Sequence, residues 1–141
     1  MRQVRVYSAD PLAAHSEQEL GRAASAHVLR VLRLRAGDAL TLFDGRGGEY
    51  PARLVRTGRA AAVVEVGAHL PLERESPLAI TLLQSLARGE KMDFIVQKGT
   101  ELGVTRIVPV AVGRSVMRVP QGREGRKLEH WRAVAASACE Q

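Results

Sequence analysis

Two different hydrophobic patterns divide the chain. The second part has two apolar runs of strand length, residues 78–86 and 106–112, on either side of a segment with apolar residues at helical spacing. This strand–helix–strand order is typical of a parallel α/β sheet. The first part instead predicts a small, mostly β module, because its apolar runs are short and bounded by turn residues. These runs lie at residues 4–7, 39–43, 49–56 and 60–66.

The first part also contains one helical pattern, residues 21–34, and Gly37 stands where a left-handed cap would end that helix. Residues 44–48 and 57–59 have the composition of hairpin turns. Pro51 lacks an amide donor, so its strand is predicted to lie at a sheet edge or to bulge there. Several short strands with one helix indicate a compact barrel.

The helix of the second part carries an apolar stripe with cations along one edge. Lys91 and Lys98 are seven residues apart and border the stripe, close to the strand ends where open α/β sheets bind ligands. This arrangement indicates an anionic substrate. The alternatives are that the lysines extend from an ordinary packed helix, or that Lys98 forms a surface ion pair with Glu101. The stripe consists of Met92, Ile95, Val96, Gly99 and Leu102.

A last helical pattern runs to the end of the chain, and Cys139 within it is interpreted as a packed thiol. Two strands and two helices leave most of the sheet's apolar surface uncovered. We therefore expect the chain to be the front portion of a longer protein. The predicted apolar arc of this helix comprises Leu128, Trp131, Val134, Ala135, Ala138 and Cys139.

Composition and charge narrow the class of protein. The 141 residues are 45% hydrophobic and 26% charged, as in globular proteins, and allow one domain or two small ones. The net charge is +6: residues 1–72 carry ten basic and seven acidic side chains, and residues 73–141 carry eleven and eight. This balance favours a nucleic-acid partner. Basic residues cluster at residues 114–127 and at Arg30, Arg33 and Arg35, although the last two could simply complement a helix C-terminus.

Several classes of site are disfavoured by the residues present. Cys139 is the only cysteine, so no internal disulfide can form. The four histidines are scattered and give no metal-ligand spacing. No stretch of 18 apolar residues and no apolar leader segment is present, so the protein is interpreted as cytoplasmic.

Several motifs recur in an order and spacing that point to one family. The central ones are residues 88–92 (RGEKM), residues 97–104 (QKGTELGV) and Pro109-Val110. Together with the others, they resemble the RsmE family, ribosomal RNA uridine methyltransferases of the knotted, S-adenosylmethionine-dependent SPOUT class. The remaining motifs are residues 27–33 (HVLRVLR), 43–45 (FDG), 75–77 (ESP), 114–115 (RS) and 138–141 (ACEQ).

The resemblance implies a two-domain protein of mixed α+β and α/β class. Residues 1–72 would form a PUA-like RNA-binding β-barrel, residues 73–77 a linker, and residues 78–141 the first part of a SPOUT (trefoil-knot) α/β methyltransferase domain, ending before the knot. The implied partner is small-subunit ribosomal RNA, and the full-length protein would be a homodimer. The implied cofactor is S-adenosylmethionine, whose site is expected beyond residue 141. The chain alone should therefore be inactive and bind the cofactor weakly or not at all.

The implied reaction places a methyl group on the ring nitrogen N3 of a uridine, which requires loss of a proton and stabilisation of negative charge. Glu140 is the candidate proton acceptor and Arg114 the second candidate catalytic residue. On the helical wheel Glu140 lies opposite the apolar arc, so the alternative is that its side chain is simply solvated. His27 is interpreted as a packed histidine and Asp44 as a turn residue. The candidate RNA-binding residues are Arg30, Arg33, Arg88, Lys91, Lys98, Arg118 and Gln141.

The sequence also allows two other hypotheses about function. The chain could be an RNA-binding module of the PUA-like kind without catalytic activity. It could also be a small interaction domain, since 18 of its 21 basic residues are arginine and genome composition alone can produce that bias.

Overall fold

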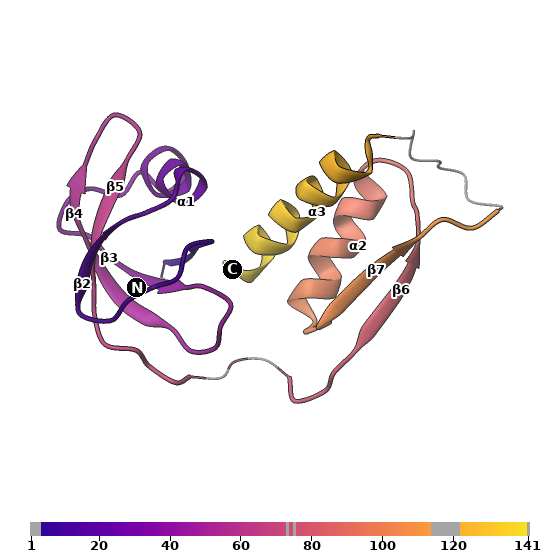
Figure 1. Ribbon diagram of the computed structural model, residues 1–141, viewed down its shortest axis with the longest axis horizontal. Helices are drawn as coiled ribbons and strands as arrows, with labels where there is room; N and C mark the ends of the chain where they lie inside the picture. Colours follow the sequence, from indigo (N-terminus) through magenta and orange to yellow (C-terminus); the bar gives the residue numbers. More distant parts are fainter. Residues whose placement is uncertain (1–3, 73, 75, 114–121, 141) are drawn as a thin grey trace. The chain divides into compact units, whose positions relative to one another are not determined.

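The computed structural model describes residues 4–72, 74, 76–113 and 122–140, which divide into two compact units. The first unit comprises Met1–Arg74 together with Glu140, and the second comprises Glu75–Cys139 together with Gln141. In Figure 1 the first unit runs from indigo to magenta and the second from salmon to yellow.

The first unit is built on one five-stranded mixed sheet with the order β1-β3-β4-β5-β2. β1 pairs with β3 in parallel, and the other neighbours are antiparallel. Within the described residues the edge strands β1 and β2 do not pair with each other, so the sheet is not closed into the expected barrel. These edges are only three and four residues long and offer few groups for closure. The strands are β1 Arg5–Tyr7, β2 Ser16–Glu19, β3 Ala39–Phe43, β4 Tyr50–Thr57 and β5 Ala62–Val66.

Apolar side chains at alternate positions of these strands form the core of the first unit. Inward-facing positions of the central strands are fully buried, as expected for a sheet with one covered face. Val28 from the helix is also fully buried and packs into the same cluster. The strand members of the cluster with the least exposure are Val6, Leu42, Leu54, Ala62, Val64 and Val66.

The helix that covers this core is shorter than predicted. α1 (Arg22–Ala26) continues into a π-helical turn, η1 (His27–Val31), and the chain leaves the helix through Arg33, whose φ of 54° is left-handed. The N–H of Leu34 returns to the carbonyl of Val28 at 3.0 Å. Gly37 also has a positive φ of 98°, but its N–H donates to Leu54 of β4 at 2.7 Å. The expectation that Gly37 caps the helix is therefore wrong.

Pro51 lies in a central strand, contrary to the expectation of an edge or a bulge at that residue. β4 pairs on both sides, and its register shift lies between Leu54 and Arg56. The carbonyl of Pro51 accepts the N–H of Gly67 at 2.8 Å, but proline cannot return a bond to the carbonyl of Gly67. The N–H of His15 donates to that carbonyl instead, at 3.2 Å. The N–H of His15 thus takes the place of the N–H that Pro51 lacks.

The β3–β4 turn depends on glycine for two separable reasons. Gly47 and Gly48 both have positive φ, 91° and 71°. A Cβ on Gly47 would meet nothing within 4 Å, whereas one on Gly48 would clash with the ring of His69 and lie 2.6 Å from the carbonyl oxygen of Leu70. Only at Gly48 does lack of space add to backbone strain.

We expect Gly48→Ala to destabilise the first unit more than Gly47→Ala. Left-handed backbone costs an alanine roughly 1 kcal/mol at either position, and the clash at Gly48 adds about 1–3 kcal/mol. Urea unfolding of both variants, followed by far-ultraviolet circular dichroism, measures the difference. Equal losses would show that the His69 and Leu70 contacts yield without cost.

A buried carboxylate ties the last residues of the first unit to the sheet. Glu49 is 3% exposed, and both of its oxygens accept hydrogen bonds from the guanidinium of Arg74, at 2.9 and 3.1 Å. Arg5, which stacks over Phe43, lies 3.7 Å away on the same carboxylate. The hydrogen bonds from Arg74 lower the pKa of Glu49, against the opposing effect of burial, and the charges of Arg74 and Arg5 lower it further. The same pairing raises the pKa of Arg74.

The second unit confirms the predicted strand–helix–strand order. Its two strands, β6 (Thr81–Ser85) and β7 (Arg106–Val110), are parallel, and α2 (Glu90–Glu101) lies between them in sequence. α3 (Glu124–Cys139) packs against α2 (Figure 1). A Cβ on Gly99 of α2 would lie 3.4 and 3.9 Å from the side chains of Ile107 and Leu82, so the helix rests on this face of the two strands. The small core combines Leu86, Met92, Val96 and Trp131.

The other face of the two-stranded sheet is open. Leu82 faces α2, so the alternation of β6 turns Leu83 to the opposite side, where it is 70% exposed. The expectation of uncovered apolar sheet surface is confirmed. Three residues predicted on apolar helix faces are exposed instead. Leu102 of the α2 stripe lies just past the end of that helix and is 78% exposed, and Leu128 of the α3 arc is 40% exposed. Cys139 of the same arc is exposed, so its interpretation as a packed thiol is wrong.

The described helices include none that combines the length and the apolar character required to cross a membrane.

Candidate functional site

The arginines at the end of the first unit's helix are available for a ligand. Arg30 in η1 and the following Arg33 and Arg35 are exposed. In the part of the chain that the structure describes, none of these three guanidinium groups forms an ion pair. Guanidinium groups hold phosphate oxygens in a bidentate manner, so this helix end can bind a polyanion.

Other arginines of the first unit are already engaged. Arg56 of β4 forms an ion pair with Glu17 of β2, and Arg53 donates to the carbonyl of Gly37 at 2.6 Å while facing Glu65 across the strand pair. The polar face of the sheet therefore carries balanced charge. This contrast favours the helix end over the sheet face as the basic surface.

Glu140 groups with the first unit by its contacts. Its Oε1 accepts the N–H of Tyr7 at 3.0 Å, and its Oε2 lies 3.5 Å from Nε2 of His27. The Glu140 side chain is 13% exposed, so it does not lie on a solvated face. His27 is half-buried beside it, which agrees with the interpretation of a packed histidine. A carboxylate oriented by a main-chain donor keeps lone pairs with which to accept a proton.

Asp44 serves the turn, as expected. Its Oδ1 accepts the N–H of Arg46 at 3.0 Å and its Oδ2 accepts that of Leu12 at 3.3 Å. This is the bonding of an Asx turn, which leaves Asp44 a structural task.

In the second unit the predicted cations lie along α2. Arg88 and Lys91 are both exposed, the former just before the helix and the latter in its first turn. Lys98 donates to Glu101 at 2.6 Å, so the surface ion pair left open by the spacing is present. The Lys98 ammonium also lies 6.0 Å from the centre of the Phe94 ring. Three further candidates, Arg114, Arg118 and Gln141, lie outside the described residues.

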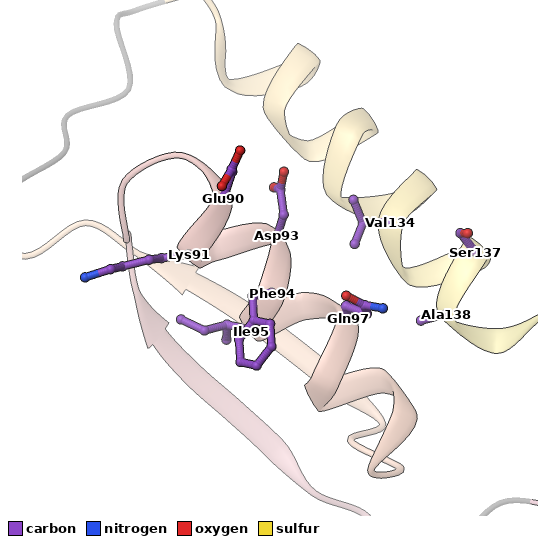
Figure 2. Close-up of a pocket in the computed structure, with 9 residues that line it drawn as sticks. All are labelled: Glu90, Lys91, Asp93, Phe94, Ile95, Gln97, Val134, Ser137 and Ala138. Carbon is purple, nitrogen blue, oxygen red and sulfur yellow. The ribbon is translucent and has the colours of Figure 1, made fainter. Parts of the chain in front are cut away.

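A groove of about 800 Å³ lies between α2 and α3. Figure 2 shows the Gln97 side chain extending from α2 toward Ala138 of α3, while Lys91 points away from α3. Phe94 borders the groove and is 60% exposed. On the α3 side, His130 bonds to Asp93 of α2 at 2.8 Å and joins the two helices. The lining comprises Glu90, Lys91, Asp93, Phe94, Ile95, Gln97, Val134, Ser137 and Ala138.

Lys91 was the one candidate site residue of the groove that the sequence predicted, and no site role was predicted for Phe94 or Gln97. Phe94 falls off the apolar stripe of α2, and an aromatic residue outside such a stripe was the available signal. Gln97 belongs to the motif of residues 97–104, but nothing in its spacing indicates that its amide enters a groove.

Two domain families match the chain in succession. The RNA methyltransferase PUA domain matches residues 20–67 and the RNA methyltransferase domain matches residues 74–141. A ribosomal RNA small subunit methyltransferase E from Neisseria gonorrhoeae, solved bound to S-adenosyl methionine, is 38% identical with a TM-score of 0.92 over 99% of this chain and 57% of that one. The chain belongs to the RsmE family.

Other relatives agree with membership of the RsmE family. A putative methyltransferase from Legionella pneumophila, solved with bound cofactor, is 34% identical with a TM-score of 0.95 over 100% of this chain and 58% of that one. The Bacillus subtilis ribosomal RNA small subunit methyltransferase E is 30% identical over 82% of this chain and 45% of its own length. The chain thus spans about half the length of the RsmE relatives it matches.

Proposed function

We propose that the protein transfers a methyl group from S-adenosylmethionine to N3 of a uridine in small-subunit ribosomal RNA. This chain would supply the RNA-holding module and the first part of the catalytic domain. The observation that carries the proposal is the succession of a PUA match and a methyltransferase match on one chain with a TM-score of 0.92 to a small subunit methyltransferase E.

The finer features of the proposal follow from the same family. They are a PUA-like RNA-binding module, a SPOUT-class knotted domain completed by residues beyond position 141, a homodimeric assembly and action in the cytoplasm on ribosomal RNA or a ribosomal subunit. The open face of β6 and β7, with Leu83 exposed, is compatible with further strands or a partner covering it.

The chemistry sets two demands on the protein. N3 of uridine carries a proton and has no free lone pair, so a base must accept that proton as the new bond to carbon forms. The negative charge then spreads onto the two flanking carbonyl oxygens, which positive groups can stabilise. The base must also be unpaired or flipped out of its stack to be reached.

The proposed roles assign these demands to residues already described. Glu140 accepts the proton from N3. Arg114, together with Arg88 and Lys91, stabilises the uridine oxygens or positions RNA phosphate. Contacts to the RNA backbone are proposed for Arg30, Arg33, Lys98, Arg118 and Gln141.

The described residues do not form a recognisable S-adenosylmethionine site. The glycines of residues 45–48 turn the chain between the antiparallel strands β3 and β4, so they do not lead into a helix N-terminus as phosphate- and nucleotide-binding glycine loops do. The α2–α3 groove has no glycine-rich turn among its lining residues. We therefore assign no residue of this chain to the cofactor.

The test is a methyl-transfer assay on the protein expressed from its complete reading frame, with radiolabelled S-adenosylmethionine and unmethylated small-subunit RNA. We expect label in the RNA, and nuclease digestion with mass spectrometry should recover 3-methyluridine. The 141-residue chain, measured in parallel by calorimetry, should bind the cofactor weakly or not at all. Absence of transfer with intact RNA binding would favour a non-catalytic RNA-binding module, and methyl at another atom would overturn the N3 assignment.

A further inference from the structure

We infer that the groove between α2 and α3 is a binding site for an unpaired nucleobase of RNA, which stacks on Phe94 and hydrogen-bonds to the amide of Gln97. This inference rests on the proposed function, in that it names a second contact which the substrate RNA makes. It concerns the second unit alone, and neither Phe94 nor Gln97 has a role in the proposed function.

The first observation is the exposed aromatic ring beside a concavity. Phe94 keeps 60% of its surface in solvent, although Met92 and Val96, two residues before and after it on the same helix, are buried. Leaving a large apolar side chain in water forgoes the free energy that burial would bring. Proteins that recognise single-stranded RNA use such rings as stacking platforms, because every base presents a flat face of matching size.

The second observation is the set of polar groups without protein partners. Within the described residues, no hydrogen bond joins the Gln97 amide or the Ser137 hydroxyl to another protein group, although Gln97 is half-buried. An amide offers one acceptor and two donors side by side, which complements the alternating donors and acceptors on a base edge. A fully apolar occupant would bury that amide without a partner, at a cost in free energy.

The charge of the groove distinguishes a base from a phosphate. Glu90 and Asp93 line the groove, Lys91 is the one cationic residue of its lining, and Lys98 near the Phe94 ring is paired with Glu101. The local charge is therefore not positive, and a phosphate in the groove would be repelled by the carboxylates. An uncharged planar group fits both this balance and the apolar wall formed by Ile95, Val134 and Ala138. The sugar–phosphate chain would run outside, where Lys91 points in Figure 2.

The experiment measures fluorescence anisotropy of two labelled RNA strands on the protein expressed from its complete reading frame. One strand is an oligouridine, and the other has the same backbone with abasic riboses. We expect Phe94→Ala to weaken oligouridine binding about tenfold, and Gln97→Ala to weaken it by a smaller factor, about threefold. Binding of the abasic strand should be unchanged. Phe94→Tyr keeps the ring and should retain affinity.

Leu102→Ala is the matched control, because Leu102 is a large exposed residue at the end of the same helix but outside the groove. The emission of Trp131, the single tryptophan, checks that each variant keeps the α2–α3 core. The inference fails if wild type binds the two strands equally, or if Phe94→Ala behaves as Leu102→Ala does. It also fails if Phe94→Ala dissociates a dimer while RNA affinity stays unchanged.

The methyl-transfer assay on the same protein separates this inference from the function on which it rests. Methyl transfer with Phe94-independent RNA binding overturns the groove alone. Phe94-dependent binding of bases without methyl transfer overturns the proposed reaction and leaves the groove as a nucleobase site.

Discussion

Replacing Glu49 with glutamine should destabilise the first unit by about 3 kcal/mol at neutral pH. Removing one member of a buried ion pair costs about 3–5 kcal/mol, because the remaining charge loses its partner in a dry environment. The lower end applies here, since the side chain of Arg74 is 52% exposed and water can solvate it after the change. Arg5, which is 26% exposed and stacked on Phe43, also loses its ion pair with Glu49 in this variant.

The contribution of Glu49 should also depend on pH in a defined direction. The folded protein lowers the pKa of Glu49 below the ordinary value of 4.5 that we take for the unfolded chain. Well above pH 4.5 the carboxylate is ionised in both states, and its full stabilisation is present. As the pH falls below 4.5, the unfolded chain binds a proton first, and the stabilisation is lost as the pH passes through the lowered pKa. The stability gap between wild type and Glu49→Gln should therefore be constant near neutral pH and close in acid.

Glu17→Gln provides the control, because Glu17 pairs with Arg56 in an exposed ion pair that should contribute at most about 1 kcal/mol. Urea titrations between pH 3 and 7 measure both variants. Both tyrosines, Tyr7 and Tyr50, belong to the first unit, whereas the only tryptophan, Trp131, belongs to the second. In Glu49→Gln the unfolding transition followed by tyrosine fluorescence should therefore move to a lower urea concentration. A loss no greater than that of Glu17→Gln would contradict a structural role for the buried carboxylate.

The sequence was sufficient where structure follows from local periodicity. β3 has the predicted boundaries, β4 and β5 differ by one or two residues, and the α2 stripe buries Met92, Val96 and Gly99. It failed at β2, whose residues Ser-Glu-Gln-Glu show no apolar alternation. That strand exists because β5 offers it a paired edge, and an edge strand with solvent on its outer side needs little apolar character.

Errors at the helix end have a physical cause in the backbone. Glycine is the usual left-handed residue, so Gly37 was the predicted cap, but the π-helical turn brings the chain to a left-handed Arg33 instead. An i to i−5 hydrogen bond, here from Leu32 to His27 at 2.9 Å, leaves no trace in a hydrophobic pattern. It also determines where Arg30 and Arg33 stand at the helix end.

The candidate site was predictable in kind more than in geometry. Exposed arginines and lysines follow from their charge, and family motifs supply their proposed roles. Glu49 could not be identified as a buried acid, because its burial depends on Arg74, 25 residues away in sequence. The anchoring of Glu140 by Tyr7 is more remote still, at a separation of 133 residues. Such contacts are set by tertiary structure, which neither spacing nor composition encodes locally.

We expect Glu140→Gln, made in the protein expressed from its complete reading frame, to lower the methyl-transfer rate by about 10²–10⁴-fold, the usual contribution of a positioned general base. Glutamine can still accept the N–H of Tyr7 through its amide oxygen, but it cannot take up the proton of N3. Glu140→Asp keeps a carboxylate on a shorter stem and should retain more activity than the glutamine variant. RNA affinity, measured by anisotropy, should be unchanged in both.

A purely structural role for Glu140 predicts the reverse order, because glutamine preserves the shape and the Tyr7 contact better than aspartate does. The pH dependence gives a second criterion. Without a base, the reaction can proceed only through the small fraction of uridine that ionises by itself, so the rate of Glu140→Gln should rise about tenfold per pH unit below the pKa of the uridine. A glutamine variant that turns over at the wild-type rate, with a wild-type pH profile, would remove Glu140 from the chemistry and leave it as an anchor for Tyr7 and His27.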